Sequence, residues 1–306
     1  RWDMLQIERV KLELEEDESL LGRRAATALR VPETEVREVQ LLRRAIDARE
    51  GVRFVCTLRV AVKNEGQVLK RCRNKNVFLV EEERYRLPEP SAPPRVPPVV
   101  VGAGPGGLFC ALALARCGAR PILLERGWNV ERRQADVERF WETGELDLQS
   151  NVQFGEGGAG AFSDGKLNTG TRDIRHRFIL EALVSYGAPE SILYDAKPHI
   201  GTDYLRRALV RLRQALADLG CEIRFGHRLA GIEQAAGRLA ALQVEGPEGA
   251  YRLPAEQAVL ALGNSARDTF AMLHSAGVPL APKPLAVGVR IEHLQRDIDL
   301  AQYKAL

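Results

Sequence analysis

Residues 99–107 read VVVGAGPGG, and this stretch decides the fold. The three valines predict a short buried strand, and Gly102, Gly104 and Gly107 follow it with the spacing G-x-G-x-x-G. In this arrangement the first glycine permits a tight turn, the second lets the backbone approach a diphosphate, and the third lets a helix pack closely on the strand. The stretch therefore predicts a turn that binds a dinucleotide.

The residues after the turn support this interpretation. Apolar residues over 108–116 predict a helix, and residues 121–124 predict a second strand, so that a strand, a helix and a strand fit within about thirty residues, as in a parallel sheet. Glu125 ends the second strand, about twenty residues after the turn, where a carboxylate should bind ribose hydroxyls. Residues 97–115 are uncharged over about the length that a bilayer requires, but the spaced glycines favour the phosphate-binding turn.

Two further patterns indicate which dinucleotide is bound. Arg126 and Gly127 follow Glu125 directly, a pattern associated with FAD-binding flavoproteins of the glutathione-reductase type. Residues 151–170 read NVQFGEGGAGAFSDGKLNTG, with six glycines in twenty positions. A segment with so few bulky side chains allows close backbone approach to a large flat ligand, although a flexible surface loop is the alternative.

Taken together, several stretches resemble the bacterial family of uncharacterised FAD-dependent dehydrogenases, which are similar to glutathione reductase. The resemblance begins at about Val99 and covers nearly all of the following chain. It is carried by VVVGAGPGGLFCALALARCGARPILLERG, NVERRQADVERFW, NVQFGEGGAGAFSDGKLNTG, KPHIGTD, LALGNSARDTF and KPLAVGVRIEH.

The resemblance implies an α/β fold: a Rossmann-type FAD-binding domain with an inserted α+β substrate domain. It implies FAD as the cofactor, with NAD(P)H as a possible electron donor. It also implies that the cofactor is bound by the turn, by the end of the second strand and by later segments. The residues concerned are Gly102, Ala103, Gly104, Pro105, Gly106, Gly107, Glu125, Arg126, Arg133, Gly158, Lys166, Leu167, Leu229 and Gly263.

One expected cofactor motif is missing. Flavoproteins of this type carry an apolar strand that ends in Gly-Asp near the C-terminus, and no such motif precedes Leu306. The chain also starts with Arg1 and not with methionine. We therefore expect a fragment that lacks a C-terminal part.

The N-terminal part is expected to be a separate small module. Residues 1–87 contain three stretches typical of strands, 4–14, 36–46 and 52–62, a helical stretch over 18–29, and a short apolar strand over 77–80. This predicts a small α+β module of the ferredoxin-like type. The basic tract between Lys70 and Lys75 is interpreted as a solvated strand edge, with an anion or RNA contact as the alternative.

The division into domains follows from a proline-rich stretch. Residues 88–98 hold six of the 16 prolines and predict a semi-rigid linker. The first part of the FAD-binding domain is expected over 99–170. Its remaining segments (about 205–235 and 255–275) and the start of the substrate domain are expected over 171–306, where 205–219 predicts a helix and 221–225, 229–232, 257–262 and 285–291 predict strands.

Candidate catalytic residues are few. His199 and His293 lie in family-like motifs and are the weak candidates for a general acid or base. The five cysteines are scattered, so we expect reduced thiols in a cytoplasmic protein, no metal site and no redox disulfide. The formal charge of +3 is too small to indicate a nucleic-acid partner.

These patterns predict an FAD-dependent oxidoreductase that acts by hydride or electron transfer on a small molecule. Two alternatives stay open: an NAD(P)-only dehydrogenase, since Glu125 would suit its ribose equally well, and a non-catalytic nucleotide-binding or RNA-associated protein. The substrate, the electron acceptor and the oligomeric state do not follow from the sequence.

Overall fold

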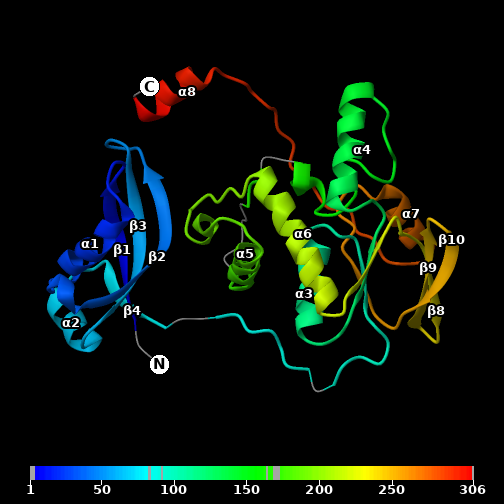
Figure 1. Cartoon of the computed structure of the whole chain (residues 1–306), viewed down its shortest axis with the longest axis horizontal. Coiled ribbons are helices and arrows are strands. Elements are labelled where there is room, and N and C mark those ends of the chain that lie inside the picture. Colours follow the sequence, from blue (N-terminus) through cyan, green and yellow to red (C-terminus); the bar gives the residue numbers. More distant parts are fainter. Residues whose placement is uncertain (1–3, 82–83, 91, 163–164, 168–172, 305–306) are drawn as a thin grey trace.

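The structure is a computed structural model that describes residues 4–81, 84–90, 92–162, 165–167 and 173–304. Figure 1 shows a small N-terminal α/β unit in blue and a larger unit in green to orange, joined by an extended cyan segment. Between Val80 and Val99 the described residues form no helix and no strand, as the prolines of this stretch require.

The N-terminal unit follows the order strand, helix, strand, strand, helix, strand. Its sheet is antiparallel in the order β2-β3-β1-β4, which is the arrangement of ferredoxin-like folds. The elements are β1 (Met4–Glu13), α1 (Leu21–Leu29), β2 (Val36–Asp47), β3 (Arg53–Val62), α2 (Glu65–Cys72) and β4 (Val77–Val80), with short 3-10 turns at Glu18–Leu20 and Glu33–Glu35.

Alternation along β3 explains how this sheet forms a core. Cys56, Leu58 and Val60 are fully buried and pack with Leu21 and Leu29 of α1, while the side chains between them face the other side. The helix α2 was not predicted. Lys70 and Arg71 lie in its last turn, so interpreting this tract as a strand edge was wrong: buried Val68 and Cys72, four residues apart, fix a helical face.

The larger unit is built on a parallel sheet. Its strands follow the order β11-β5-β6-β7, and all three pairings are parallel. A second, antiparallel sheet has the order β10-β9-β8. The strands are β5 (Val99–Val101), β6 (Ile122–Glu125), β7 (Glu222–Phe225), β8 (Arg228–Ala235), β9 (Arg238–Gly246), β10 (Gly249–Pro254) and β11 (Ala258–Leu260).

The helices of this unit are α3 (Pro105–Arg116), α4 (Val130–Thr143), α5 (Arg175–Ser185), α6 (Thr202–Asp218) and α7 (Arg267–Ser275), with 3-10 turns at Ala159–Phe162 and Glu190–Leu193. Helix α8 (Gln295–Tyr303) follows an extended segment, buries none of its residues and lies apart from these helices (Figure 1). None of the described helices is long and apolar enough to cross a membrane. The uncharged window over 97–115 is divided between β5, the glycine turn and α3.

The parallel sheet is covered on both faces. Val100 and Leu123 pack against α3 and α6, whereas Val99, Val101 and Leu124 pack against the antiparallel sheet. Burial on both faces explains why these strands are continuous apolar runs. The layers leave the carboxyl ends of β5 and β6 at one edge, and the glycine turn follows β5 there.

One predicted strand is absent. Residues 285–291 form no strand, although Leu285, Val287, Val289 and Ile291 alternate as a strand requires. Their exposed fractions are 68% to 87%, and no described strand lies beside them to accept backbone hydrogen bonds. Alternation alone predicts an extended chain, but a strand also needs a partner.

Candidate nucleotide-binding site

The turn after β5 can be formed only by glycine at its two ends. Gly102 has φ +103°, and a Cβ there would collide with the carbonyl oxygen of Ala261 at the end of β11. A Cβ at Gly107 would collide with the carbonyl oxygen of Gly102. The Gly107 collision follows from the close packing of α3 on the turn that the motif predicts, and the Gly102 collision follows from the close approach of the chain that continues β11.

The turn leaves backbone donors unpaired. Among the described residues, the N–H groups of Gly106 and Gly107 in the first turn of α3 have no recorded acceptor, and the first bond of the helix is from Leu108 N–H to Gly104. These donors lie at the positive end of the helix dipole. They can therefore bind an anion such as a diphosphate.

Glu125, the last residue of β6, is 5% exposed and is held by three backbone N–H groups. Its Oε2 accepts from Ala103 at 2.7 Å, and its Oε1 accepts from Gly127 at 2.8 Å and from Gly155 at 3.0 Å. The carboxylate thus joins the glycine turn to the glycine-rich segment. Among the described residues Oε2 accepts one hydrogen bond, so it retains a lone pair that could accept a hydrogen bond from a ribose hydroxyl.

Arg126 closes one side of the site. Its guanidinium donates to both carboxylate oxygens of Asp268 at 2.9 Å and lies 4.2 Å from the ring centroid of Phe154. Arg228 at the start of β8 also donates to Asp268, at 3.2 Å. The hydrogen bonds from Arg126, then that from Thr269 N–H and the positive charges of Arg126 and Arg228, lower the pKa of Asp268, so the carboxylate is charged at neutral pH.

The glycine-rich segment forms the opposite wall. Gly157 N–H donates to the Ala103 carbonyl at 2.8 Å, and the position of a Cβ on Gly104 would lie 3.9 Å from Gly158 Cα. Behind the segment lies Arg133 of α4, which is fully buried. Burial lowers the pKa of Arg133 to about 10, so it still carries its charge at neutral pH.

Glu156 of the same segment is also buried. Its Oε2 accepts from Val130 N–H at 2.8 Å and from Arg213 at 2.6 Å, while no described group donates to its buried Oε1. Desolvation raises the pKa of Glu156 to about 7. This group ties the segment to the start of α4 and to α6.

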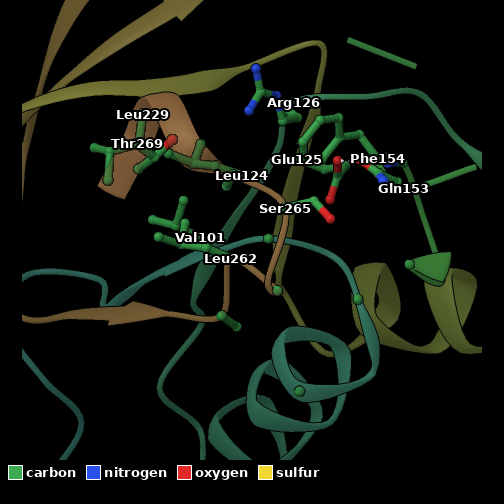
Figure 2. A pocket seen from close by; sticks show the side chains of 18 of the residues that line it. Val101, Leu124, Glu125, Arg126, Gln153, Phe154, Leu229, Leu262, Ser265 and Thr269 are labelled. Carbon is green, nitrogen blue, oxygen red and sulfur yellow. Dashed lines mark hydrogen bonds between the residues drawn. The ribbon is translucent and has the colours of Figure 1, made fainter. Parts of the chain in front are cut away.

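Together these elements enclose a pocket of about 340 Å³. Figure 2 shows side chains from the ends of β5 and β6, from the glycine-rich segment and from the segment after β11 around one space. The lining residues are Val101, Gly102, Gly104, Pro105, Gly106, Leu124, Glu125, Arg126, Gln153, Phe154, Gly155, Gly158, Ala159, His227, Arg228, Leu229, Ala261, Leu262, Gly263, Asn264, Ser265, Ala266 and Thr269.

The structure brings many of the candidate cofactor residues together at this pocket. Nine of them line it: Gly102, Gly104, Pro105, Gly106, Glu125, Arg126, Gly158, Leu229 and Gly263. Ala103 and Gly107 do not line it but fix the turn. Arg133 lies behind the wall and not in the lining. Direct contact of any of these residues with a cofactor stays a prediction.

The remaining candidates lie elsewhere. Lys166 forms an isolated bridge with His199, and Leu167 borders a different pocket beside α5. His199 and His293 are both exposed, and neither lines the nucleotide pocket. Asn168, Thr169 and Gly170 of the family-like loop ending lie outside the described residues.

The sequence did not reveal the partners of Arg126. These are Asp268, which lies beside the pocket, and Phe154, which lines it. A signal for Phe154 was present, since it interrupts a segment of small residues. No local signal pairs Asp268 with Arg126, because the two residues lie 142 positions apart.

Comparisons with known proteins find similar sequences whose functions are not known. Residues 4–63 match a domain of unknown function, DUF8436. An uncharacterized protein of Clostridium beijerinckii is 39% identical over 302 residues, which are 98% of this chain and 56% of that protein. The chain thus spans about half the length of the curated relative that it matches.

Solved structures with similar folds include THI4 of Thermovibrio ammonificans, at 18% identity and a TM-score of 0.39, covering 60% of this chain and 64% of that one. A geranylgeranyl bacteriochlorophyll reductase-like protein of Thermoplasma acidophilum matches at 13% identity and a TM-score of 0.37, covering 60% and 43%. A third match is the ternary complex of aklavinone-11 hydroxylase with FAD and aklavinone, at 20% identity and a TM-score of 0.28, covering 58% and 35%. At these TM-scores the likeness carries no conclusion about this chain.

Proposed function

We propose that this chain supplies the FAD-binding part of an FAD-dependent oxidoreductase. The observation that carries the proposal is one pocket with two matched ends: unpaired N–H groups of Gly106 and Gly107 at the start of α3, and the carboxylate of Glu125 at the end of β6. A dinucleotide presents a diphosphate, which accepts hydrogen bonds, and a ribose diol, which donates them, so each end of the pocket has a matching group. The resemblance of the glycine-rich segment to FAD-dependent dehydrogenases favours FAD over a nicotinamide nucleotide.

Each wall of the pocket has a part in this function. The N–H groups of the turn would donate to the diphosphate, and Glu125 would accept a ribose hydroxyl. The adenine would lie near Arg126 and Phe154, where a flat cation already packs on an aromatic ring. When bound, FAD supplies the hydride or electron transfer, and the protein's part is to bind and orient it.

The proposal extends to the division of the chain. Residues 1–87 would be a separate module, 88–98 a linker, and 99 onward the cofactor domain with the start of a substrate domain. A small-molecule substrate would bind near the reactive flavin ring. Its pocket would therefore lie outside the pocket described above, which would hold the adenosine part of the cofactor. The catalytic acid or base stays unassigned, since His199 and His293 lie outside the pocket.

Titration of the purified chain with FAD and with NADH, by calorimetry, tests this function. We expect FAD to bind more tightly and to leave the protein yellow after gel filtration. Gly104→Val should abolish binding, because its side chain would fill the space between Gly104 and Gly158. Gly66→Val on the exposed side of α2, where a Cβ meets no atom within 4 Å, is the control and should bind FAD normally. Binding of NADH without binding of FAD would overturn the proposal in favour of an NAD(P)-only dehydrogenase.

A further inference from the structure

We propose that Arg133 is a positioning residue for the diphosphate of the nucleotide, which acts through the glycine-rich backbone and not by direct contact. This inference rests on the proposed nucleotide binding. It changes the role that the family resemblance gives to Arg133, which is that of a cofactor ligand.

The first observation is the set of acceptors around the guanidinium. Nε donates to Asn151 O at 2.8 Å and Nη2 donates to Val152 O at 2.9 Å. Nη1 lies within hydrogen-bond distance of three carbonyls: Gly155 O at 3.3 Å, Glu156 O at 2.7 Å and Gly158 O at 2.8 Å. The five carbonyls belong to one segment, so a single fully buried side chain sets the path of that backbone.

The second observation is that the segment is fitted to this side chain. Gly155 has φ +120°, and a Cβ there would collide with Arg133 Cδ. On its other side the segment contacts the glycine turn, through Gly157 N–H and the Ala103 carbonyl. Arg133 and the turn therefore hold the segment between them.

The third observation concerns the direction of a donor. In a planar trans peptide the C=O and the following N–H point in opposite directions. Because the Gly158 carbonyl points at Arg133, the N–H of Ala159 points away from it, on the side where Gly158 and Ala159 line the pocket. Among the described residues the structure records no acceptor for this N–H. It faces the same pocket as the donors of the turn.

These observations assign a task to the guanidinium fork. It gathers the carbonyls behind the wall and so turns the Ala159 N–H toward the diphosphate position. Lysine would keep the charge but offers a compact ammonium that cannot span carbonyls spread over eight residues. The task therefore requires arginine and is not met by charge alone.

The test compares ADP with adenosine, since the two probes differ only in the diphosphate. Their dissociation constants are measured by calorimetry for the full chain and for Arg133→Lys and Arg133→Met. In the wild type we expect ADP to bind at least about tenfold more tightly than adenosine, given the strength of charge-assisted hydrogen bonds. In both variants the ratio of the two constants should fall toward one. Arg132→Met, an exposed neighbour on α4 that packs on Trp128, is the matched control and should keep the wild-type ratio.

Other outcomes would overturn the inference. A ratio that survives in Arg133→Lys but is lost in Arg133→Met would show that charge acts directly on the phosphates. Equal weakening of both probes would show a purely structural role. A wild type that binds neither ADP nor FAD would instead overturn the proposed function.

A second pair of variants tests the donor while Arg133 is kept. Ala159→Pro removes the N–H at the first position of the 3-10 turn, and Ala159→Ser keeps it. We expect the ratio to fall in Ala159→Pro alone. A normal ratio in Ala159→Pro would also overturn the inference.

Discussion

Asp268, in the first turn of α7, accepts two parallel hydrogen bonds of 2.9 Å from the guanidinium of Arg126, which follows β6. The pair joins two elements that are distant in sequence across the edge of the nucleotide pocket. The side-chain oxygen of Gln149 also accepts from this guanidinium, at 3.0 Å and 3.1 Å. Asp268 and Gln149 together hold the guanidinium over the ring of Phe154. Arg126 is thus fixed before any ligand binds.

Asp268→Asn should weaken FAD binding by about threefold to tenfold, since it removes the charge that orients Arg126. The free energy of unfolding should change by less than about 1 kcal/mol, because the Asp268 side chain is 44% exposed. Calorimetry and urea denaturation measure the two quantities. Asp297→Asn on α8 is the control, because among the described residues this carboxylate meets one long contact, from Arg296 at 3.4 Å. Unchanged FAD affinity in Asp268→Asn would show that the pair does not serve the pocket.

Local patterns in the sequence were sufficient to predict the elements at the centre of the site. The strand β5, the turn and α3 are encoded within eighteen consecutive residues, where spacing and sterics act directly. Glu125 was found for the same reason, since it ends the strand next in the chain. Helix α2 was missed because its charged residues hid a narrow apolar face.

The surroundings of the site could not be found in this way. The acceptors of Arg133 are backbone carbonyls 18 to 25 residues away, and backbone groups carry no sequence signature. The strand expected over 285–291 failed for a related reason. Its pattern states which face would be buried but not whether a neighbouring strand exists, and the structure describes none.

Gly102→Ala should be more damaging than Gly118→Ala. Both glycines have positive φ, so alanine is strained by about 1 kcal/mol at either position. Only at Gly102 does the added Cβ also collide with backbone, at the Ala261 carbonyl, while Gly118 faces open space. We expect Gly102→Ala to cost at least about 2 kcal/mol more in urea denaturation. Equal losses would mean that the β11 end can move away from the turn.

Arg44 of β2 is expected to slow hydrogen exchange in residues 194–196 of the larger unit. Arg44 N–H donates to Tyr194 O at 2.7 Å, Ala196 N–H donates to Arg44 O at 2.9 Å, and the Arg44 side chain pairs with Asp195 at 3.0 Å. Arg44→Met should speed hydrogen exchange at Ala196 by about tenfold, the factor that corresponds to one lost charge-assisted bond. Arg43→Met, an exposed neighbour, should leave the exchange unchanged. Equal rates in wild type and Arg44→Met would mean that the side chain does not hold this contact.

Glu156→Gln should change how stability depends on pH. The pKa of Glu156 is raised to about 7 from its usual 4.5 because burial disfavours the charged form. The folded protein therefore holds this proton more tightly than the unfolded chain, so the stabilisation is present below about pH 4.5 and is lost as the pH rises through 7. Glutamine is neutral throughout, so it removes this dependence.

The wild type should accordingly lose stability relative to Glu156→Gln between pH 5 and pH 8, by at most about 3 kcal/mol. The charged groups that face Glu156 are Arg213 of α6 and Glu131 and Arg133 of α4. Urea denaturation at each pH measures the difference between the two proteins. Glu131→Gln is the control: hydrogen bonding to Arg213 lowers the pKa of Glu131, so this half-exposed carboxylate should cause no such loss. A flat difference for Glu156→Gln would mean that Arg213 keeps Glu156 ionised over the whole range, because an ion pair of 2.6 Å would then outweigh the desolvation.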